Sequence, residues 1–194
     1  MTKPLSGMYA ALLSGFSDDG SFSTQRQIAI TEYVLKQGLS GIYIGGSSGE
    51  SGLMSTDELL DQQRLIASIP ATQKSRVIAH VGQPNLRDSI ALAKQAESLG
   101  FEALSALPPH SYPFSDDDIL HYYTELSAAT PLPMIVYEVP IRTGRPLPEG
   151  LLLKILDLPN VAGMKFTSTD LFKMTMLQRA RPDKTFFFGF DEIF

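Results

Sequence analysis

The chain has 194 residues, a formal net charge of -5 and no cysteine. The acidic balance argues against a broad basic surface for nucleic acid or an anionic membrane, and the lack of cysteine excludes disulfides, thiolate metal ligands and a cysteine nucleophile. No apolar run approaches the length of a membrane span, and no apolar leader opens the chain, so we expect a soluble, cytoplasmic protein. The histidines lack metal-ligand spacing, so we expect no metal site.

Strands and helices are predicted to alternate along the chain. Short apolar runs between turn residues predict seven strands, over residues 7–13, 41–44, 76–81, 103–107, 133–137, 161–165 and 184–189. Cap residues followed by apolar positions at helical spacing predict the intervening helices, which begin near residues 24, 56, 86, 116, 148 and 170. This alternation is typical of an α/β protein with a parallel sheet built from βαβ units.

Two architectures fit the alternation, an open doubly wound sheet and a (β/α)₈ TIM barrel. The first strand is not followed by G-x-G-x-x-G, so a dinucleotide-binding sheet lacks its fingerprint. Polar residues follow nearly every strand, and barrel enzymes collect their active sites at the carboxyl ends of their strands. We therefore predict one TIM-barrel domain over residues 1–194 that is truncated after the seventh of its eight strands.

A lysine stands at the end of the sixth predicted strand. Residues 161–164 are apolar, and Lys165 follows them directly. Burial would disfavour the charged form of such a lysine, and a neutral amine can condense with a ketone to form a Schiff base. The alternative is a lysine whose stem lies along apolar surface while its ammonium stays in water. These residues alone leave both interpretations open.

Residues at two other strand ends could act together with Lys165. Residues 45–50, G-G-S-S-G-E, offer backbone N–H groups and the hydroxyls of Ser47 and Ser48; such a nest can hold a carboxylate or phosphate, although Gly/Ser runs are more often plain turns. Tyr137 ends the strand that would neighbour Lys165 in a parallel barrel. It could relay a proton, or it could be a core tyrosine with its hydroxyl at the rim.

Further polar groups follow the sixth and seventh predicted strands. Thr167 shares the strand face of Lys165 because side chains alternate along a strand. Asp191 and Glu192 follow the seventh strand, where their carboxylates could accept hydrogen bonds from substrate hydroxyls or could instead cap a helix.

These residues, in their order and spacing, resemble the N-acetylneuraminate lyase / dihydrodipicolinate synthase family. Four separated motifs carry the resemblance, namely residues 45–50, Tyr137, residues 163–168 (G-M-K-F-T-S) and residues 189–193 (G-F-D-E-I). The resemblance implies a class I aldolase on a (β/α)₈ barrel, usually a homotetramer, that acts on a 2-keto acid without any cofactor. It assigns the Schiff base with pyruvate to Lys165.

The same resemblance implies roles for the neighbouring residues. Tyr137 relays protons, while Ser47 and Ser48 bind the substrate carboxylate and Ser47 hydrogen-bonds to the tyrosine. Within the family the chain resembles the sialic-acid lyases most. Their contacts to sugar hydroxyls match a set of residues at the ends of the last two strands, Thr167, Gly189, Asp191 and Glu192. The implied reaction is cleavage of N-acetylneuraminate to N-acetylmannosamine and pyruvate.

Two residues and one short segment, residues 51–54 (S-G-L-M) after the carboxylate loop, depart from the lyase pattern. Arg142 stands where the synthase branch carries an arginine that binds its semialdehyde substrate. Ser111 stands where the family usually has a tyrosine that reaches into a neighbouring subunit's site. Three alternatives therefore stay open: cleavage of another 2-keto-3-deoxy acid, condensation of pyruvate with aspartate semialdehyde, and a non-catalytic truncated protein that binds keto acids.

Overall fold

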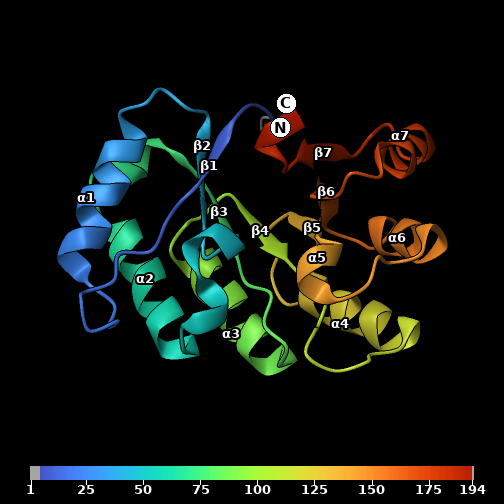
Figure 1. The fold of residues 1–194 in the computed structure, drawn as a ribbon, viewed down its shortest axis with the longest axis horizontal. Helices are drawn as coiled ribbons and strands as arrows, with labels where there is room; N and C mark the ends of the chain where they lie inside the picture. The colour runs from blue at the N-terminus through green and yellow to red at the C-terminus, as the bar shows by residue number, and fades with distance from the viewer. Residues whose placement is uncertain (1–4, 194) are drawn as a thin grey trace. The chain divides into compact units, whose positions relative to one another are not determined.

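The computed structural model describes residues 5–193, so the ends of the predicted domain, residues 1–4 and 194, lie outside the described residues. It contains seven strands, β1 (Tyr9–Ala11), β2 (Gly41–Ile44), β3 (Arg76–His80), β4 (Ala103–Ala106), β5 (Met134–Glu138), β6 (Val161–Phe166) and β7 (Thr185–Phe188) (Figure 1). The α-helices are α1 (Thr24–Leu35), α2 (Thr56–Ser68), α3 (Leu86–Ser98), α4 (Asp116–Ala128), α5 (Pro140–Thr143), α6 (Glu149–Leu156) and α7 (Leu171–Ala180). The predicted alternation is confirmed.

The strands form one sheet in which their order follows the chain, from β1 to β7. The pairs β1–β2, β2–β3, β5–β6 and β6–β7 are parallel. Every residue of β2, β4 and β5 is buried, as expected for a parallel sheet whose strands read as continuous apolar runs. The predicted order and direction of these strands therefore agree with the structure.

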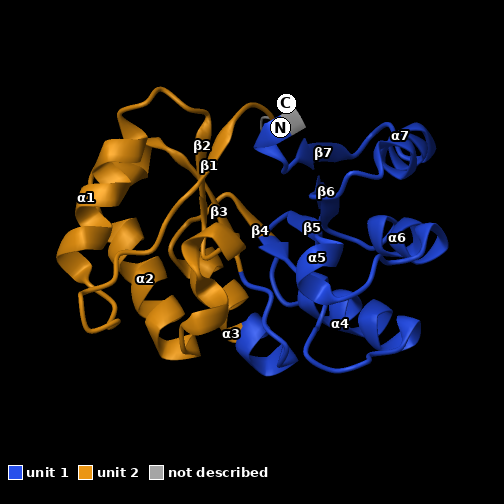
Figure 2. Ribbon diagram, viewed as in Figure 1, with its two compact units in different colours: residues 1–5, 81–90, 105–194 blue, residues 6–80, 91–104 orange. Residues whose placement is uncertain are grey.

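The chain divides into two compact units (Figure 2). One unit comprises residues 1–5, 81–90 and 105–194, and the other comprises residues 6–80 and 91–104. We call them the C-terminal unit and the N-terminal unit. That residues 1–194 form a single domain stays a prediction.

The N-terminal unit holds β1 to β3 with α1 and α2, which pack against each other. Ser23 caps α1, and its hydroxyl accepts a hydrogen bond from the N–H of Arg26. Ser55 and Glu58 form a reciprocal capping box at the start of α2, which satisfies two donors that the helix itself leaves unpaired. These caps lie where the sequence predicts the helices to begin.

The C-terminal unit holds β5 to β7, and α4, α6 and α7 pack in succession beside them (Figure 1). β6 and β7 approach closely at Gly163, because a Cβ at this position would overlap the backbone of Thr185. The turn α5 is absent from the predicted elements. It begins with Pro140, whose fixed φ suits a first helical position, and it ends at Gly144, which has a φ of 84°.

Candidate functional site

Lys165 and Tyr137 lie side by side at the carboxyl ends of β6 and β5. The two residues are direct partners in the strand register. The Nζ atom of Lys165 lies 3.9 Å from the centre of the Tyr137 ring, so the amine sits over the aromatic face, a favourable position for its ammonium form. The tyrosine is buried and the lysine is half-buried. An amine and a phenol thus meet at one strand end.

Thr167 and Gly189 also lie close to this lysine. A Cβ at Gly189 would overlap Oγ1 of Thr167 and would lie 3.2 Å from Cε of Lys165. The N–H of Gly189 donates to the carbonyl of Phe166 at 3.0 Å, which holds the glycine against the end of β6. The lack of a side chain at Gly189 therefore preserves space next to the amine.

The Thr167 hydroxyl is a buried polar group with unused hydrogen-bonding capacity. Thr167 is 7% exposed, and among the described residues its Oγ1 has no hydrogen-bond partner. An unpaired buried hydroxyl costs free energy, and a bound ligand could supply the missing partner. Asp191 and Glu192 follow on a short 3₁₀ turn (Asp191–Ile193), and both are exposed.

Ser47 and Ser48 lie in the N-terminal unit, in the turn that follows β2. Gly45 has a φ of 64°, and Glu50, with a φ of 58°, also occupies the left-handed region. Between them the chain forms a 3₁₀ turn, Ser47–Gly49, in which Ser47 is half-buried and Ser48 is exposed. The predicted hydrogen bond from Ser47 to Tyr137 stays a prediction.

A buried network of polar side chains is hydrogen-bonded to this turn. The hydroxyl of Ser14 donates to the carbonyl of Gly49 at 2.5 Å, and the amide of Gln62 donates to Ser14 Oγ at 2.8 Å and to Gln27 Oε1 at 3.1 Å. Gln27 on α1 and Gln62 on α2 are 0% and 2% exposed. The glutamines are absent from the predicted site, although each stands inside a predicted helix and a buried polar side chain must find partners.

We expect Ser14→Ala to lower the free energy of unfolding by about 1–3 kcal/mol, because the Gly49 carbonyl and the Gln62 amide would each lose a partner. Urea unfolding followed by circular dichroism measures the change. Ser98→Ala is the matched control, since the Ser98 hydroxyl also donates to a backbone carbonyl, that of Gln95, but at an exposed position. Equal losses in the two variants would contradict a supporting role for Ser14.

Two residues of the predicted site region, Arg142 and Ser111, are exposed. Arg142 lies on α5, and Ser111 has a φ of 80°, a conformation that few non-glycine residues adopt. In the same unit a hollow of about 230 Å³ lies between the loops that follow β4 and β5. Tyr112, Phe114 and Arg145 are among its lining residues.

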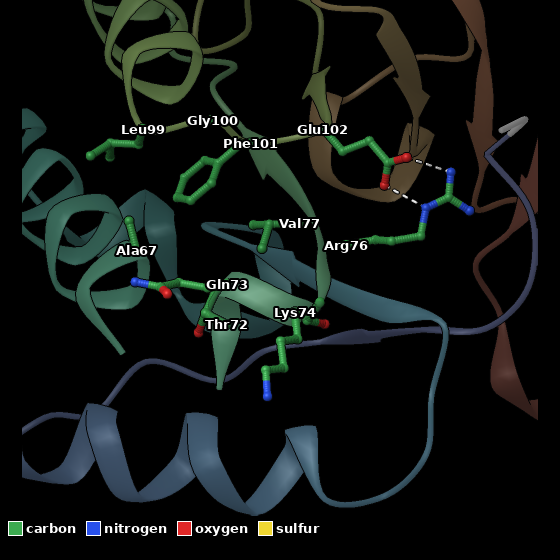
Figure 3. A pocket seen from close by; sticks show the side chains of 11 residues that line it. Ala67, Thr72, Gln73, Lys74, Arg76, Val77, Leu99, Gly100, Phe101 and Glu102 are labelled. Atoms are coloured by element: carbon green, nitrogen blue, oxygen red, sulfur yellow. Dashed lines mark hydrogen bonds and ion pairs between the residues drawn. The ribbon is translucent and has the colours of Figure 1, made fainter. Parts of the chain in front are cut away.

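A larger hollow, of about 340 Å³, lies in the N-terminal unit. Val77, Leu99 and Phe101 surround it, and the guanidinium of Arg76 is hydrogen-bonded to the carboxylate of Glu102 (Figure 3). These residues belong to the amino ends of β3 and β4. Barrel enzymes hold their active sites at the carboxyl ends of the strands, so this hollow is not the candidate site.

Among the described residues no cluster of three or more His, Cys, Asp or Glu side chains could hold a metal ion. Within the same described part of the chain, no helix has both the length and the apolar character needed to span a membrane.

Residues 4–194 match the model of the Dihydrodipicolinate synthetase family. The chain is 40% identical over 190 residues to an N-acetylneuraminate lyase of Rhizobium meliloti (strain 1021), covering 97% of this chain and 62% of that protein. It is 37% identical over 195 residues to an N-acetylneuraminate lyase of Enterobacter sp. (strain 638), covering 100% of this chain and 65% of that protein. The chain thus spans less than two thirds of the length of these relatives.

The chain is also similar to solved structures of proteins related to these lyases. The N-acetylneuraminate lyase from Mycoplasma synoviae has a TM-score of 0.88 and 34% identity, over 96% of this chain and 63% of that chain. CdNal from Clostridium difficile, solved in complex with mannosamine, has a TM-score of 0.89 and 31% identity, over 98% of this chain and 66% of that chain. Together with the strand order, these likenesses confirm the predicted TIM-barrel fold class.

Proposed function

Since the chain belongs to the dihydrodipicolinate synthetase family, we propose that it carries the Schiff-base centre of a class I aldolase, a carbon–carbon lyase that cleaves a 2-keto-3-deoxy acid to pyruvate and an aldehyde. One observation carries the proposal. The Lys165 amine lies 3.9 Å from the ring centre of Tyr137, next to the space that Gly189 leaves open and the unpartnered hydroxyl of Thr167. The nucleophilic amine of Lys165 and the phenol of Tyr137, which can carry a proton, therefore lie next to each other.

The chemistry follows from these groups. The Lys165 amine attacks the C2 ketone of the substrate, and loss of water gives a protonated Schiff base. Tyr137 gives its phenol proton to the hydroxyl that departs as water, and the resulting phenolate takes the proton of the C4 hydroxyl as the C3–C4 bond breaks. The bonding pair moves into the iminium to form an enamine, and the aldehyde leaves. Protonation of the enamine at C3 and hydrolysis then release pyruvate and restore the amine.

We propose N-acetylneuraminate as the substrate, with N-acetylmannosamine and pyruvate as products. The support is the likeness to proteins named N-acetylneuraminate lyase. In this proposal Ser47 and Ser48 bind the carboxylate through a turn rich in backbone N–H groups. The sugar hydroxyls meet the groups at the ends of the last two strands, which are Thr167, Gly189, Asp191 and Glu192.

Borohydride reduction in the presence of pyruvate tests the proposed centre. We expect a reduced pyruvate adduct, seen by intact mass and placed on Lys165 by peptide mapping. The adduct should be absent in Lys165→Ala. A folded protein that forms no adduct would refute the aldolase proposal.

The second candidate function is condensation of pyruvate with aspartate semialdehyde, which the exposed Arg142 on α5 favours. If Arg142 binds the semialdehyde carboxylate, Arg142→Leu should lower kcat/KM for condensation by about 10–100-fold, the value of a hydrogen bond to a charged group. For the lyase we expect cleavage of N-acetylneuraminate to change little in this variant. Measuring both reactions in both proteins separates the two functions.

We further propose that the protein is a cytoplasmic homotetramer that contacts neither nucleic acid nor membrane. The family resemblance supports the tetramer, and the net charge of -5 supports the lack of a nucleic-acid partner. Light scattering coupled to size-exclusion chromatography measures the subunit number.

A further inference from the structure

A buried ion pair lies directly behind the tyrosine of the candidate site. Glu138 follows Tyr137 in β5, so its side chain points to the opposite face of the sheet. Glu138 is 0% exposed, and its Oε1 lies 3.4 Å from Nζ of Lys173, whose side chain is 13% exposed. Taking two charges out of water costs free energy. We therefore asked what the buried carboxylate and ammonium do at this position.

The pair holds the backbone of Leu147, which lies in the loop between α5 and α6. The N–H of Leu147 donates to Glu138 Oε1 at 3.0 Å, and the carbonyl of Leu147 accepts from Lys173 Nζ. Leu147 is 1% exposed, so its N–H and its carbonyl need protein partners. Both partners come from the two members of the ion pair.

Glu138 and Lys173 also join this loop to the one that follows β6. Lys173 lies in the first turn of α7, where its N–H donates to the capping carboxylate of Asp170 at 3.0 Å. The N–H of Thr167 donates to the carbonyl of Glu138 at 2.8 Å. Glu138 is thus bonded through its backbone to the β6–α7 loop and through its side chain to the β5–α6 loop.

The pKa of the Glu138 carboxyl is raised above its ordinary value, chiefly by burial, and the Leu147 N–H and the Lys173 ammonium offset part of this rise. The Lys173 ammonium therefore helps to keep the carboxylate charged and able to accept both hydrogen bonds.

We propose that Glu138 and Lys173 are positioning residues that hold Tyr137 and Thr167 in place for carbon–carbon cleavage, an inference that rests on the proposed function. The pair sits on the far side of β5 from Tyr137 and links the loops after β5 and β6. Misplacing a catalytic group by about 1 Å can cost on the order of 100-fold in rate. The Schiff base with pyruvate needs the Lys165 amine and no contact between Thr167 and a sugar hydroxyl, so trapping of pyruvate should change much less than turnover.

The test compares Glu138→Gln and Lys173→Met with the unaltered protein. Turnover of N-acetylneuraminate gives kcat and KM, and borohydride trapping with pyruvate gives the occupancy of Lys165. We expect kcat to fall by about 10–100-fold while the yield of trapped pyruvate is kept. Lys173→Arg, which retains the positive charge, should recover part of the lost kcat.

Lys184→Met is the matched control. Its ammonium also donates to a backbone carbonyl, that of Val161 at 2.7 Å, but at the amino end of β6. We expect kcat to be kept in this variant. A kcat in Glu138→Gln and Lys173→Met that equals the kcat of Lys184→Met overturns the proposal, and so does a loss of kcat matched by an equal loss of trapped pyruvate.

If a single variant fails to fold because it leaves one buried charge unpaired, the double variant Glu138→Gln/Lys173→Met takes its place under the same criteria. It buries no charge at this position and still offers the Leu147 N–H an amide oxygen. If the proposed function itself is wrong, the unaltered protein will form no adduct on Lys165. That result distinguishes it from a failure of this inference alone, and it would also refute this inference.

Discussion

Lys165→Ala is expected to lower kcat for cleavage of N-acetylneuraminate by on the order of 10⁴- to 10⁶-fold, the scale seen when a covalent nucleophile is removed. Without the amine no Schiff base forms, and the electrons of the C3–C4 bond have no acceptor. Pyruvate release, followed through a coupled reduction of the keto acid, measures the loss. The melting temperature should stay near that of the unaltered protein, because the Lys165 side chain is only half-buried.

The matched control is Lys154→Ala, which also removes one lysine of this unit, but from an exposed position on α6. We expect full turnover in this variant. Retention of more than a small fraction of activity in Lys165→Ala would show that the reaction proceeds without a covalent intermediate on this residue, and the proposed mechanism would be wrong.

Gly189→Ala is expected to lower kcat/KM by on the order of 100-fold, because the added Cβ would meet Oγ1 of Thr167 and lie 3.2 Å from Cε of Lys165. The Thr167 side chain, the lysine or the end of β7 must move, and each of these shifts disturbs a group of the proposed site. Steady-state kinetics and borohydride trapping measure the effect together, and we expect both kcat and the trapped yield to fall.

Gly150→Ala is the control for this change. Gly150 lies on α6, and a Cβ there would meet nothing within 4 Å. Alanine favours a helix over glycine, so we expect unchanged turnover and a gain of about 0.5 kcal/mol in the free energy of unfolding. Unchanged kinetics in Gly189→Ala would mean that the space beside Lys165 plays no part in catalysis.

The regular elements could be predicted because their signals are local. Apolar runs between turn residues gave the seven strands, and serine caps gave the starts of α1, α2 and α4. The first strand is shorter than its apolar run, Tyr9–Ala11 within predicted residues 7–13, partly because Gly7 has a φ of 97°. The helix α5 is too short to show any periodicity, and only Pro140 and Gly144 mark it.

The candidate site could be predicted only in part. The pairing of Tyr137 with Lys165 follows from two neighbouring parallel strands, and the structure places them in register. The pairs Gln27–Gln62 and Glu138–Lys173 each join residues 35 positions apart. A single sequence shows that such side chains are polar, but their partners depend on how the helices and strands pack against one another. The roles of the site residues stay predictions.

The close approach of β6 and β7 at Gly163 has a consequence for how this family's substrate range can be altered. A methyl group at 163 would overlap the backbone of Thr185 and push β7 away from β6, whereas a methyl group at 189 would meet the side chains of Thr167 and Lys165. Position 163 lies only two residues before Lys165 on β6, so a larger side chain there would shift β7 against the strand that carries the amine. If the proposed function is right, variant libraries should keep glycine at 163 and vary Asp191 and Glu192, which are exposed, instead.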